Sequence, residues 1–355
     1  MITPSAPFRL FIGTYTRAGG KGIYSVQLDP ATGQLSAPAL AAETPNPSYL
    51  ALSPDRATLY AVSEADATAA AFRVSSDRAH LHPLSRPQPA GGKAPCHLST
   101  DTTGRVLVVA NYHTGVVASL PIQAAGTLGP AATVIQHHGS SVDPDRQTSA
   151  HAHCVSVTPD NRFVLVCDLG LDKVFSYHLD AAAATLRPAE PAFIATPPGS
   201  GPRHLTFSPS GTHAFLLSEM GATVTSCRYD SAAGGLTFLD TKSTLVSPPS
   251  AENRSAAVRV HPNGRFVYAS NRGPDTIAVF AFDDSTGRLD RVEIVPARGN
   301  SPRDITLSPD GKWLVAANEV SNTLTVFRVS ADTGRLEPVP TSATISMPVC
   351  VVFAD

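Results

Sequence analysis

A repeat of about fifty residues runs along the chain and restricts its possible folds more than any other feature. Each copy contains an alternating apolar run, a polar turn such as Ser-Pro-Asp-Gly, and a second run rich in β-branched or aromatic residues. This order is typical of two antiparallel strands joined by a tight turn. Six complete copies occur, at 47–64, 95–112, 153–169, 202–219, 256–272 and 302–319.

A second strand-turn-strand element follows each hairpin and occurs seven times, as in "TLTVFRVSADTGRL". The seventh hairpin is complete only when the chain ends are joined, because 347–355 supplies its first strand and 8–15 its second. Seven four-stranded antiparallel units without a convincing helix predict an all-β, seven-bladed β-propeller. We expect it to span residues 1–355 as one domain, with the shared terminal blade closing the ring and removing a free sheet edge.

The composition indicates a folded chain and limits its partners. Hydrophobic residues make up 42% of the 355 residues and charged residues 16%, which is enough apolar surface for a large core. The formal net charge of −2 argues against a general nucleic-acid binder, so any basic patch must be local. No apolar run of about 18 residues and no basic leader before an apolar stretch occurs, so we expect neither membrane span nor signal peptide.

The five cysteines are odd in number, widely spaced and set within apolar runs: Cys96, Cys154, Cys167, Cys227 and Cys350. This pattern favours small buried hydrophobic side chains over a disulfide framework or a zinc site. We therefore expect a cytoplasmic protein in a reducing compartment. We also expect a monomer or weak homo-oligomer with no nucleic-acid or membrane partner.

Polar side chains gather at the open ends of several hairpins, where the first strand begins and the second ends. The turns at the other end carry only residues typical of type I turns. Because innermost strands line a propeller's channel, we expect the polar side chains to meet at one mouth of it. Three arginines there would form a local site for a carboxylate or phosphate. The residues concerned are Glu64, His97, His153, Arg203, His204, Glu219, Arg272, Arg303, Asp304 and Glu319.

A purely structural role is the alternative for each of these residues, because salt bridges between arginine and a carboxylate also join neighbouring blades. The distribution along the chain argues for a site. Polar side chains concentrate in the third to sixth repeats, although Ala256 of the fifth repeat, like Ser48 and Val349, fills the same first-strand position with a small or apolar side chain. Blade-to-blade bonding alone would not require that asymmetry.

Four runs carry a resemblance to a known family: "SAHAHCVSVTPDNRFVLVCDLGLDKVFSY", "GPRHLTFSPSG", "VYASNRGPDTIAVF" and "SPRDITLSPDGKWLVAANEVSNTLTVF". They resemble the lactonase family of seven-bladed propellers, which includes 6-phosphogluconolactonases and carboxy-cis,cis-muconate cyclases. The likeness covers nearly the whole chain. It implies that an intramolecular ester of a small anionic substrate is opened or formed, without a metal or other cofactor. The catalytic set that it implies is His153, Arg203, Glu219 and Arg272.

The expected reaction is the hydrolysis of 6-phosphogluconolactone to 6-phosphogluconate. A general base takes a proton from water, the hydroxide attacks the carbonyl, and donors stabilise the oxyanion. Either Glu219 or His153 is the candidate base, and Arg203 or Arg272 would hold the oxyanion or the substrate's anionic group. Substrate contacts are expected from His97, His204, Arg303, Asp304, Glu319 and Glu64. A cyclase that closes a carboxymuconate lactone with the same residues is the alternative.

Two further interpretations compete with a metal-free enzyme. His151 and His153 are two residues apart and would point the same way on a strand, as metal ligands do, but no carboxylate is spaced to complete a set. Without a metal, His151, His137 and His138 are expected to be solvated loop residues. A non-catalytic interaction scaffold is the other interpretation, since a propeller fold does not fix function. The Trp-Asp signature of common scaffold propellers is absent.

The longest unpatterned segment, 135–153, enters the polar face just before His153. A segment of this kind forms a lid or substrate wall, or is an ordered insertion. The run "FVYASN" at 266–271 adds a third interpretation, a surface-associated propeller, which the lack of an export signal weakens.

Overall fold

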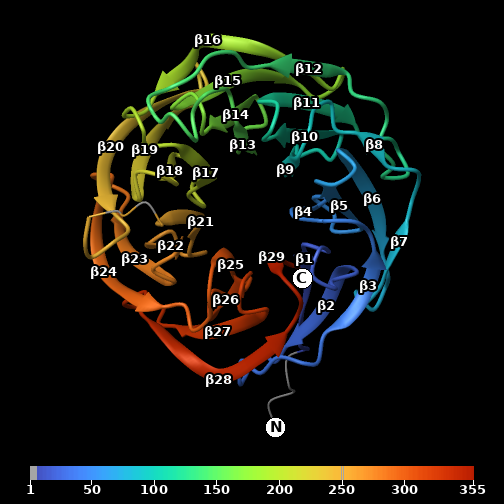
Figure 1. Ribbon diagram of the computed structural model, residues 1–355, viewed down its shortest axis with the longest axis vertical. Coiled ribbons are helices and arrows are strands. Elements are labelled where there is room, and N and C mark those ends of the chain that lie inside the picture. Colours follow the sequence, from blue (N-terminus) through green and yellow to red (C-terminus); the bar gives the residue numbers. More distant parts are fainter. Residues whose placement is uncertain (1–5, 249, 251) are drawn as a thin grey trace.

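A computed structural model describes residues 6–248, 250 and 252–355. Within these residues the chain forms 29 strands and no helix, so no helix is long and apolar enough to cross a membrane. The strands form seven antiparallel sheets arranged as a ring of blades around a central axis (Figure 1). The prediction of an all-β, seven-bladed propeller is confirmed.

The chain ends meet in the first blade, and the next three blades follow in sequence order. From the innermost strand outward, blade 1 contains β29 (Pro348–Phe353), β1 (Phe8–Thr14), β2 (Gly22–Leu28) and β3 (Ala39–Glu43). Blade 2 contains β4 (Leu50–Leu52), β5 (Thr58–Ser63), β6 (Thr68–Val74) and, both paired with β6, β7 (Leu81–Pro83) and β8 (Gln88–Pro89). Blade 3 contains β9 (Pro95–Thr100), β10 (Val106–Asn111), β11 (Val116–Pro121) and β12 (Thr133–Gln136). Blade 4 contains β13 (Ala152–Val157), β14 (Phe163–Asp168), β15 (Lys173–Asp180) and β16 (Thr185–Ala195).

The remaining three blades repeat the same order. Blade 5 contains β17 (Pro202–Phe207), β18 (His213–Ser218), β19 (Thr223–Asp230) and β20 (Gly235–Ser243). Blade 6 contains β21 (Arg254–Val260), β22 (Phe266–Arg272), β23 (Thr276–Asp283) and β24 (Arg288–Pro296). Blade 7 contains β25 (Pro302–Leu307), β26 (Trp313–Asn318), β27 (Thr323–Val329) and β28 (Leu336–Thr344).

The hydrophobic core lies between the blades. Each sheet packs between two neighbours, so the second strands β10, β14 and β26 are buried along their whole length. Strands buried on both faces have nearly continuous apolar runs, as in "FVLVC" of β14. One core cluster joins blades 7 and 1 through residues such as Trp313, Val26 and Val351.

Glycines in the outer turns allow one blade to approach the next. Gly33, between β2 and β3, has a φ of +75°, and an added Cβ would lie 2.5 Å from the ring of Trp313 in blade 7. Gly234, between β19 and β20, has a φ of +70°, and an added Cβ would overlap the ring of Phe163 in blade 4. Only glycine permits both the left-handed turn and the close approach. At these two positions the glycine of the repeated polar turn therefore packs directly against the neighbouring blade.

The two chain ends close the ring as predicted. β29 pairs with β1, with Phe11 opposite Val352 and Ile12 opposite Val351. β29 also contacts β25 of blade 7 and β4 of blade 2, so the terminal blade joins both neighbours. This closure leaves the inner strands of all seven blades around one axis, with their starting ends on one face.

Deletion of residues 348–355 should destabilise the protein severely, because it removes β29 and exposes the edge of β1 with the fully buried Leu10 and Ile12. We expect a large fall in Tm together with aggregation, measured by calorimetry and light scattering. The control is Asp355→Asn, which weakens a partly exposed 2.6 Å contact with Arg78 and should cost about 1 kcal/mol or less. An unchanged Tm after the deletion would contradict the closure.

Candidate active site

β-Bulges at the start of the inner strands direct neighbouring side chains into the channel. The pairing register shifts between Ala152 and Cys154 in β13, between Pro202 and His204 in β17, and between Pro302 and Asp304 in β25. The residues at the three bulges are His153, Arg203 and Arg303. A bulge interrupts the alternation of side chains and redirects one of them. Arg203 and His204 can therefore border the same narrow channel although they are adjacent in a strand.

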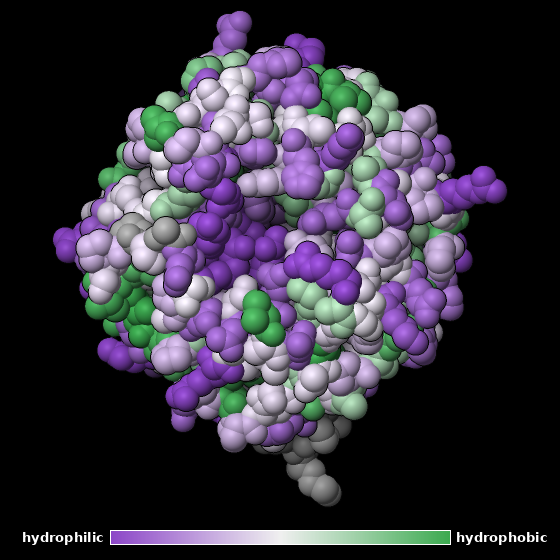
Figure 2. Space-filling view, viewed as in Figure 1, coloured by the Kyte–Doolittle hydropathy of each residue, from purple (hydrophilic) through white to green (hydrophobic). Residues whose placement is uncertain are grey.

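The mouth of the channel contains a cavity of about 280 Å³, close to the lower limit of roughly 300 Å³ for small-molecule sites. Figure 2 shows a hydrophilic hollow near the centre of this face. Four arginines and two glutamates line the cavity, so its wall is positive although the chain is slightly acidic. The lining residues are Tyr15, Glu64, Ala94, Cys96, Tyr112, His113, Arg146, His153, Glu219, Arg254, Arg272 and Arg303.

Glu219, which directly follows β18, binds three guanidinium groups. Its Oε2 accepts hydrogen bonds from Arg203 Nε and from Arg272 Nη2, both at 2.9 Å, and its Oε1 accepts one from Arg146 Nη2 at 2.8 Å. Burial alone would raise the pKa of Glu219. The positive charges of Arg272, Arg203 and Arg146 outweigh burial and hold this pKa well below its ordinary value. The Glu219 carboxylate is therefore ionised and is a very weak base.

Arg203 and Arg272 occupy different depths in this cluster. The Arg203 side chain is 3% exposed, and its Nη1 donates to His204 Nε2 at 3.0 Å and to the carbonyl of Ala256. The Arg272 side chain is 13% exposed and lines the cavity. Burial lowers the pKa of Arg272 to about 9, which leaves the guanidinium charged near neutral pH. Arg203 is the deep partner of Glu219, and Arg272 is the partner that faces the cavity.

The opposite wall of the cavity centres on Arg303. Its Nη2 donates to Tyr15 Oη at 2.8 Å, and Tyr15 in turn donates to Glu64 Oε1 at 3.2 Å. Arg303 Nη1 also lies 3.6 Å from Oε2 of Glu319, whose Oε1 accepts a hydrogen bond from Arg17 at 3.1 Å. Burial alone would lower the pKa of Arg303, but Tyr15 and Glu319 raise it above its ordinary value.

His153 and His204 lie between these two walls. Their ring centroids are 5.4 Å apart, and Nδ1 of each is buried without a hydrogen-bond partner in the described part of the chain. Burial, followed by the charge of Arg203, lowers the pKa of both histidines well below its ordinary value. Both imidazoles are therefore neutral near pH 7. His153 borders the cavity, whereas His204 borders only the narrower channel beneath it.

The structure brings most of the predicted residues together. Glu64, His153, Glu219, Arg272 and Arg303 line the cavity. Arg203, His204 and Asp304 lie beneath it, along the narrow channel.

Three predicted substrate contacts have other partners. Asp304 accepts hydrogen bonds from Arg259 at 2.7 Å and from the backbone of Val351 at 2.9 Å, and so joins blades 6, 7 and 1. His97 stacks on Tyr49 with ring centroids 3.9 Å apart. Glu319 lies 3.6 Å from Arg303 and is not among the residues that line the cavity. Their roles in substrate binding stay predictions.

Two arginines of the cavity wall have no counterpart in the predicted set. Arg146 belongs to the loop 137–151, which has no equivalent in the other repeats, so aligning the repeats gives it no position. Arg254 begins β21, two residues before the position that Ala256 occupies in the alignment. The sequence could have indicated both residues, because each is an arginine in a segment that leads into the polar face of the propeller.

The loop 137–151 is firmly anchored, so it is an ordered wall of the site. Ser141 Oγ donates to Asp172 at 2.6 Å, and Gln147 Nε2 donates to the carbonyl of Leu169 at 2.8 Å. His137 Nδ1 lies 2.6 Å from Asp168 Oδ2, and its Nε2 lies 2.7 Å from Tyr177 Oη. The expectation that His137 is a solvated loop residue is wrong, because its side chain is buried by these partners.

The geometry separates the two histidines that suggested a metal site. The bulge at His153 breaks the alternation that would make His151 and His153 point the same way. His151 stacks on Tyr112 with ring centroids 4.5 Å apart, and its Nδ1 lies 2.9 Å from the Tyr112 carbonyl oxygen. Among the described residues, no group of three or more His, Cys, Asp or Glu side chains is arranged to hold a metal ion.

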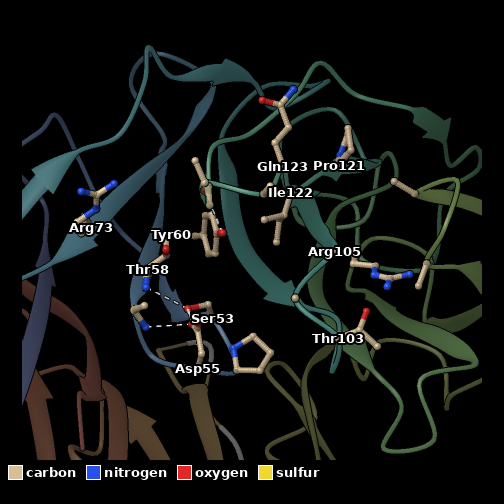
Figure 3. Close-up of a pocket in the computed structure, with 18 of the residues that line it drawn as sticks. Ser53, Asp55, Thr58, Tyr60, Arg73, Thr103, Arg105, Pro121, Ile122 and Gln123 are labelled. Atoms are coloured by element: carbon tan, nitrogen blue, oxygen red, sulfur yellow. Dashed lines mark hydrogen bonds between the residues drawn. The ribbon is translucent and has the colours of Figure 1, made fainter.

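A larger groove of about 970 Å³ lies on the opposite face, among the hairpin turns (Figure 3). Its polar contacts are those of the turns themselves: Thr58 N donates to Ser53 Oγ at 3.0 Å, and Tyr60 Oη donates to the Gly126 carbonyl at 3.0 Å. None of the predicted site residues lines this groove. This groove is therefore separate from the cluster of charged and imidazole groups at the channel mouth.

Comparisons with known proteins agree on one family. A family model described as "Lactonase, 7-bladed beta-propeller" matches residues 9–353. A 6-phosphogluconolactonase of Bacillus subtilis is 35% identical over 97% of both chains. A crystal structure of a putative 6-phosphogluconolactonase from Bacteroides fragilis has a TM-score of 0.93 and 34% identity over 100% of both chains. A periplasmic gluconolactonase from Pseudomonas aeruginosa has the same TM-score and identity over 98% of this chain and 99% of its own.

Glu219→Gln should lower the free energy of unfolding by about 3–5 kcal/mol, because it leaves buried guanidinium groups without a counter-charge. The matched control is Glu319→Gln at the equivalent repeat position, which has the 60% exposed partner Arg17 and only a longer 3.6 Å contact with Arg303; its cost should be smaller, about 1 kcal/mol. Denaturant unfolding measures both. Equal costs for the two variants would show that the Glu219 cluster is not the stabilising contact that its burial indicates.

Proposed function

The chain belongs to the lactonase family of seven-bladed β-propellers, and we propose that this lactonase hydrolyses a small anionic sugar lactone in the cavity at the channel mouth. The proposed substrate is 6-phosphogluconolactone. One observation carries the proposal: four arginines and two glutamates line the cavity, so an anion is attracted to a wall with excess positive charge. Guanidinium groups bind phosphate and carboxylate oxygens through paired hydrogen bonds. The name of the Bacillus subtilis relative supports the same substrate.

We propose His153 as the general base and not Glu219. The three guanidinium groups bound to Glu219 make its carboxylate a very weak base. His153 borders the cavity, and its imidazole is neutral near pH 7 because its pKa is lowered by burial. A neutral imidazole can take a proton from water, whereas an imidazolium cannot. Glu219 then acts as a positioning residue that holds Arg203 and Arg272.

The proposed reaction needs only side chains and water. His153 removes a proton from water as the oxygen attacks the lactone carbonyl carbon, and Arg272 stabilises the negative charge on the carbonyl oxygen. When the bond between the carbonyl carbon and the ring oxygen breaks, the imidazolium of His153 returns the proton to the ring oxygen. The product is the open hydroxy acid. Arg203 binds Glu219 at the deep end of the cavity. In the opposite wall, Arg303 and Glu64 both form hydrogen bonds with the Tyr15 hydroxyl.

We propose the cytoplasm as the location of this activity. All five cysteines are free thiols, which is usual in a reducing compartment. A periplasmic location is the alternative, and the name of the Pseudomonas aeruginosa relative favours it.

The purified protein should accelerate the opening of 6-phosphogluconolactone above its spontaneous rate, measured as acid release in a weakly buffered solution. Gluconolactone and a carboxymuconolactone are assayed in parallel, with heat-denatured protein as the control. EDTA should leave the rate unchanged, because the proposed steps use no metal. Acceleration of the carboxymuconolactone alone would indicate the cyclase. If none of the three lactones opened faster, the proposal would be wrong and a scaffold role would gain support.

His153→Asn should lower kcat for this substrate by about 100-fold or more, as expected for the loss of a general base. The wild-type kcat/KM should stay level as the pH falls through 6.5 and decline only at lower pH, because the active form is the neutral imidazole and burial lowers its pKa. The control is His151→Asn, because the His151 ring stacks on Tyr112 but does not itself line the cavity. Full activity of the His153 variant, or an acidic decline that begins well above pH 6.5, would contradict this assignment.

A further inference from the structure

Arg146 adds a positive charge that the Glu219 cluster does not need. Arg203 and Arg272 already bind Glu219 with two guanidinium groups, which more than balance one carboxylate. Arg146 contributes a third guanidinium to the same carboxylate at 2.8 Å. Burial alone would lower the pKa of Arg146, but Glu219 and the hydrogen bond to Tyr112 raise it above its ordinary value, so this guanidinium is charged and adds to the attraction for an incoming anion.

The chain places this arginine with a dedicated, ordered segment. The loop 137–151 is held by Ser141 on Asp172 and by Gln147 on Leu169, on both sides of Arg146 in the sequence. The Arg146 backbone is also fixed directly, because its N–H donates to Asp143 Oδ1 at 2.8 Å. A guanidinium fixed in advance loses little conformational entropy when a ligand binds.

Arg146 can bind a ligand without giving up its present contacts. Both of its side-chain hydrogen bonds, to Glu219 and to Tyr112 Oη at 3.2 Å, use Nη2. Within the residues that the structure describes, Nε and Nη1 of Arg146 make no hydrogen bond. The side chain is 27% exposed, and it lines the cavity together with Arg254.

The exposure of the three arginines that bind Glu219 therefore rises from the narrow channel to the rim of the cavity. Arg203 is 3% exposed, Arg272 is 13% exposed and Arg146 is 27% exposed. The proposed base, His153, is buried and belongs to the deep part. A phosphorylated sugar lactone has a similar division, because its reacting carbonyl is in the ring and its phosphate is on an exocyclic carbon. With the carbonyl near His153 and Arg272, the phosphate is directed toward the rim.

We propose that Arg146, with Arg254 beside it, forms a subsite for the substrate's phosphate and makes the enzyme prefer phosphorylated over unphosphorylated lactones. This inference rests on the proposed function, since it assigns Arg272 to the carbonyl and the rim residues Arg146 and Arg254 to the phosphate. Such a subsite can form only on the side of the cavity that carries Arg146, because the loop 137–151 occurs in only one of the seven repeats.

The test compares Arg146→Gln with wild type on 6-phosphogluconolactone and on gluconolactone. The variant should lose about 10- to 100-fold in kcat/KM for the phosphorylated lactone, mainly through KM, as expected for a charge-assisted hydrogen bond. Its kcat/KM for the unphosphorylated lactone should stay within about threefold, a change of less than one hydrogen bond. Arg146→Lys keeps the positive charge but loses the paired N–H donors of the guanidinium. Its kcat/KM for the phosphorylated lactone should lie between those of wild type and Arg146→Gln. Arg288→Gln, at an exposed arginine that does not line the cavity, is the control and should change neither.

The outcomes separate the subsite from the proposed function. Equal losses on both lactones would show that Arg146 only positions Glu219, which would overturn the subsite and leave the lactonase intact. Calorimetric titration with inorganic phosphate tests the subsite without any turnover: wild type should bind it, and Arg146→Gln should bind it at least tenfold more weakly. Equal phosphate affinity in the two proteins would overturn the inference. Thermal melting of each variant confirms that a loss does not come from unfolding.

Discussion

Ring closure is the constraint on which the rest of this structure depends. The pairing of β29 with β1 makes the terminal blade equivalent to the other six, so no sheet edge is left at the junction of the ends. It also fixes the inner strands around one axis. Side chains that begin these strands then come within hydrogen-bond distance although they are far apart in sequence. Arg203 and the backbone of Ala256, or Arg303 and Tyr15, meet for this reason.

The charged mouth of the channel combines ion pairs that join the blades with an excess of positive charge around the cavity. Glu219 joins blades 5 and 6 and the loop 137–151 through Arg272 and Arg146, as a blade-to-blade salt bridge would. The same contacts leave an excess of guanidinium charge at a cavity open to solvent. Burial lowers the pKa of His153, so its imidazole is neutral near pH 7, while the surrounding guanidinium groups keep Glu219 ionised. The groove among the turns is larger than the cavity at the channel mouth but has no comparable cluster of arginines, glutamates and histidines. Size alone therefore does not indicate the candidate site.

The repeat pattern allowed part of the site to be predicted and hid the rest. Aligned hairpins place Glu219 and Arg272 at strand ends on one face, and the structure joins them at 2.9 Å. The same alignment could not place Arg146, because its loop has no equivalent elsewhere in the chain. It also could not rank Asp304, which occupies a repeat position like that of His204 but bonds to Arg259 and to the backbone of a third blade. The position of a residue in the repeat predicts where its side chain lies within its own blade. Its partners come from other blades, and the repeat does not specify them.

The sequence by itself determined the seven-bladed architecture, the sharing of one blade by both chain ends and the face on which the polar groups meet. These follow from local patterns, since a strand, a turn and their order are encoded within a few residues of each other. Tertiary structure alone decided that Arg146 lines the cavity, that His137 is buried, and that Glu219 binds three guanidinium groups. Each of these depends on distances between segments that are remote in the chain. Electrostatic free energy and desolvation follow such distances in space, and sequence separation does not specify them.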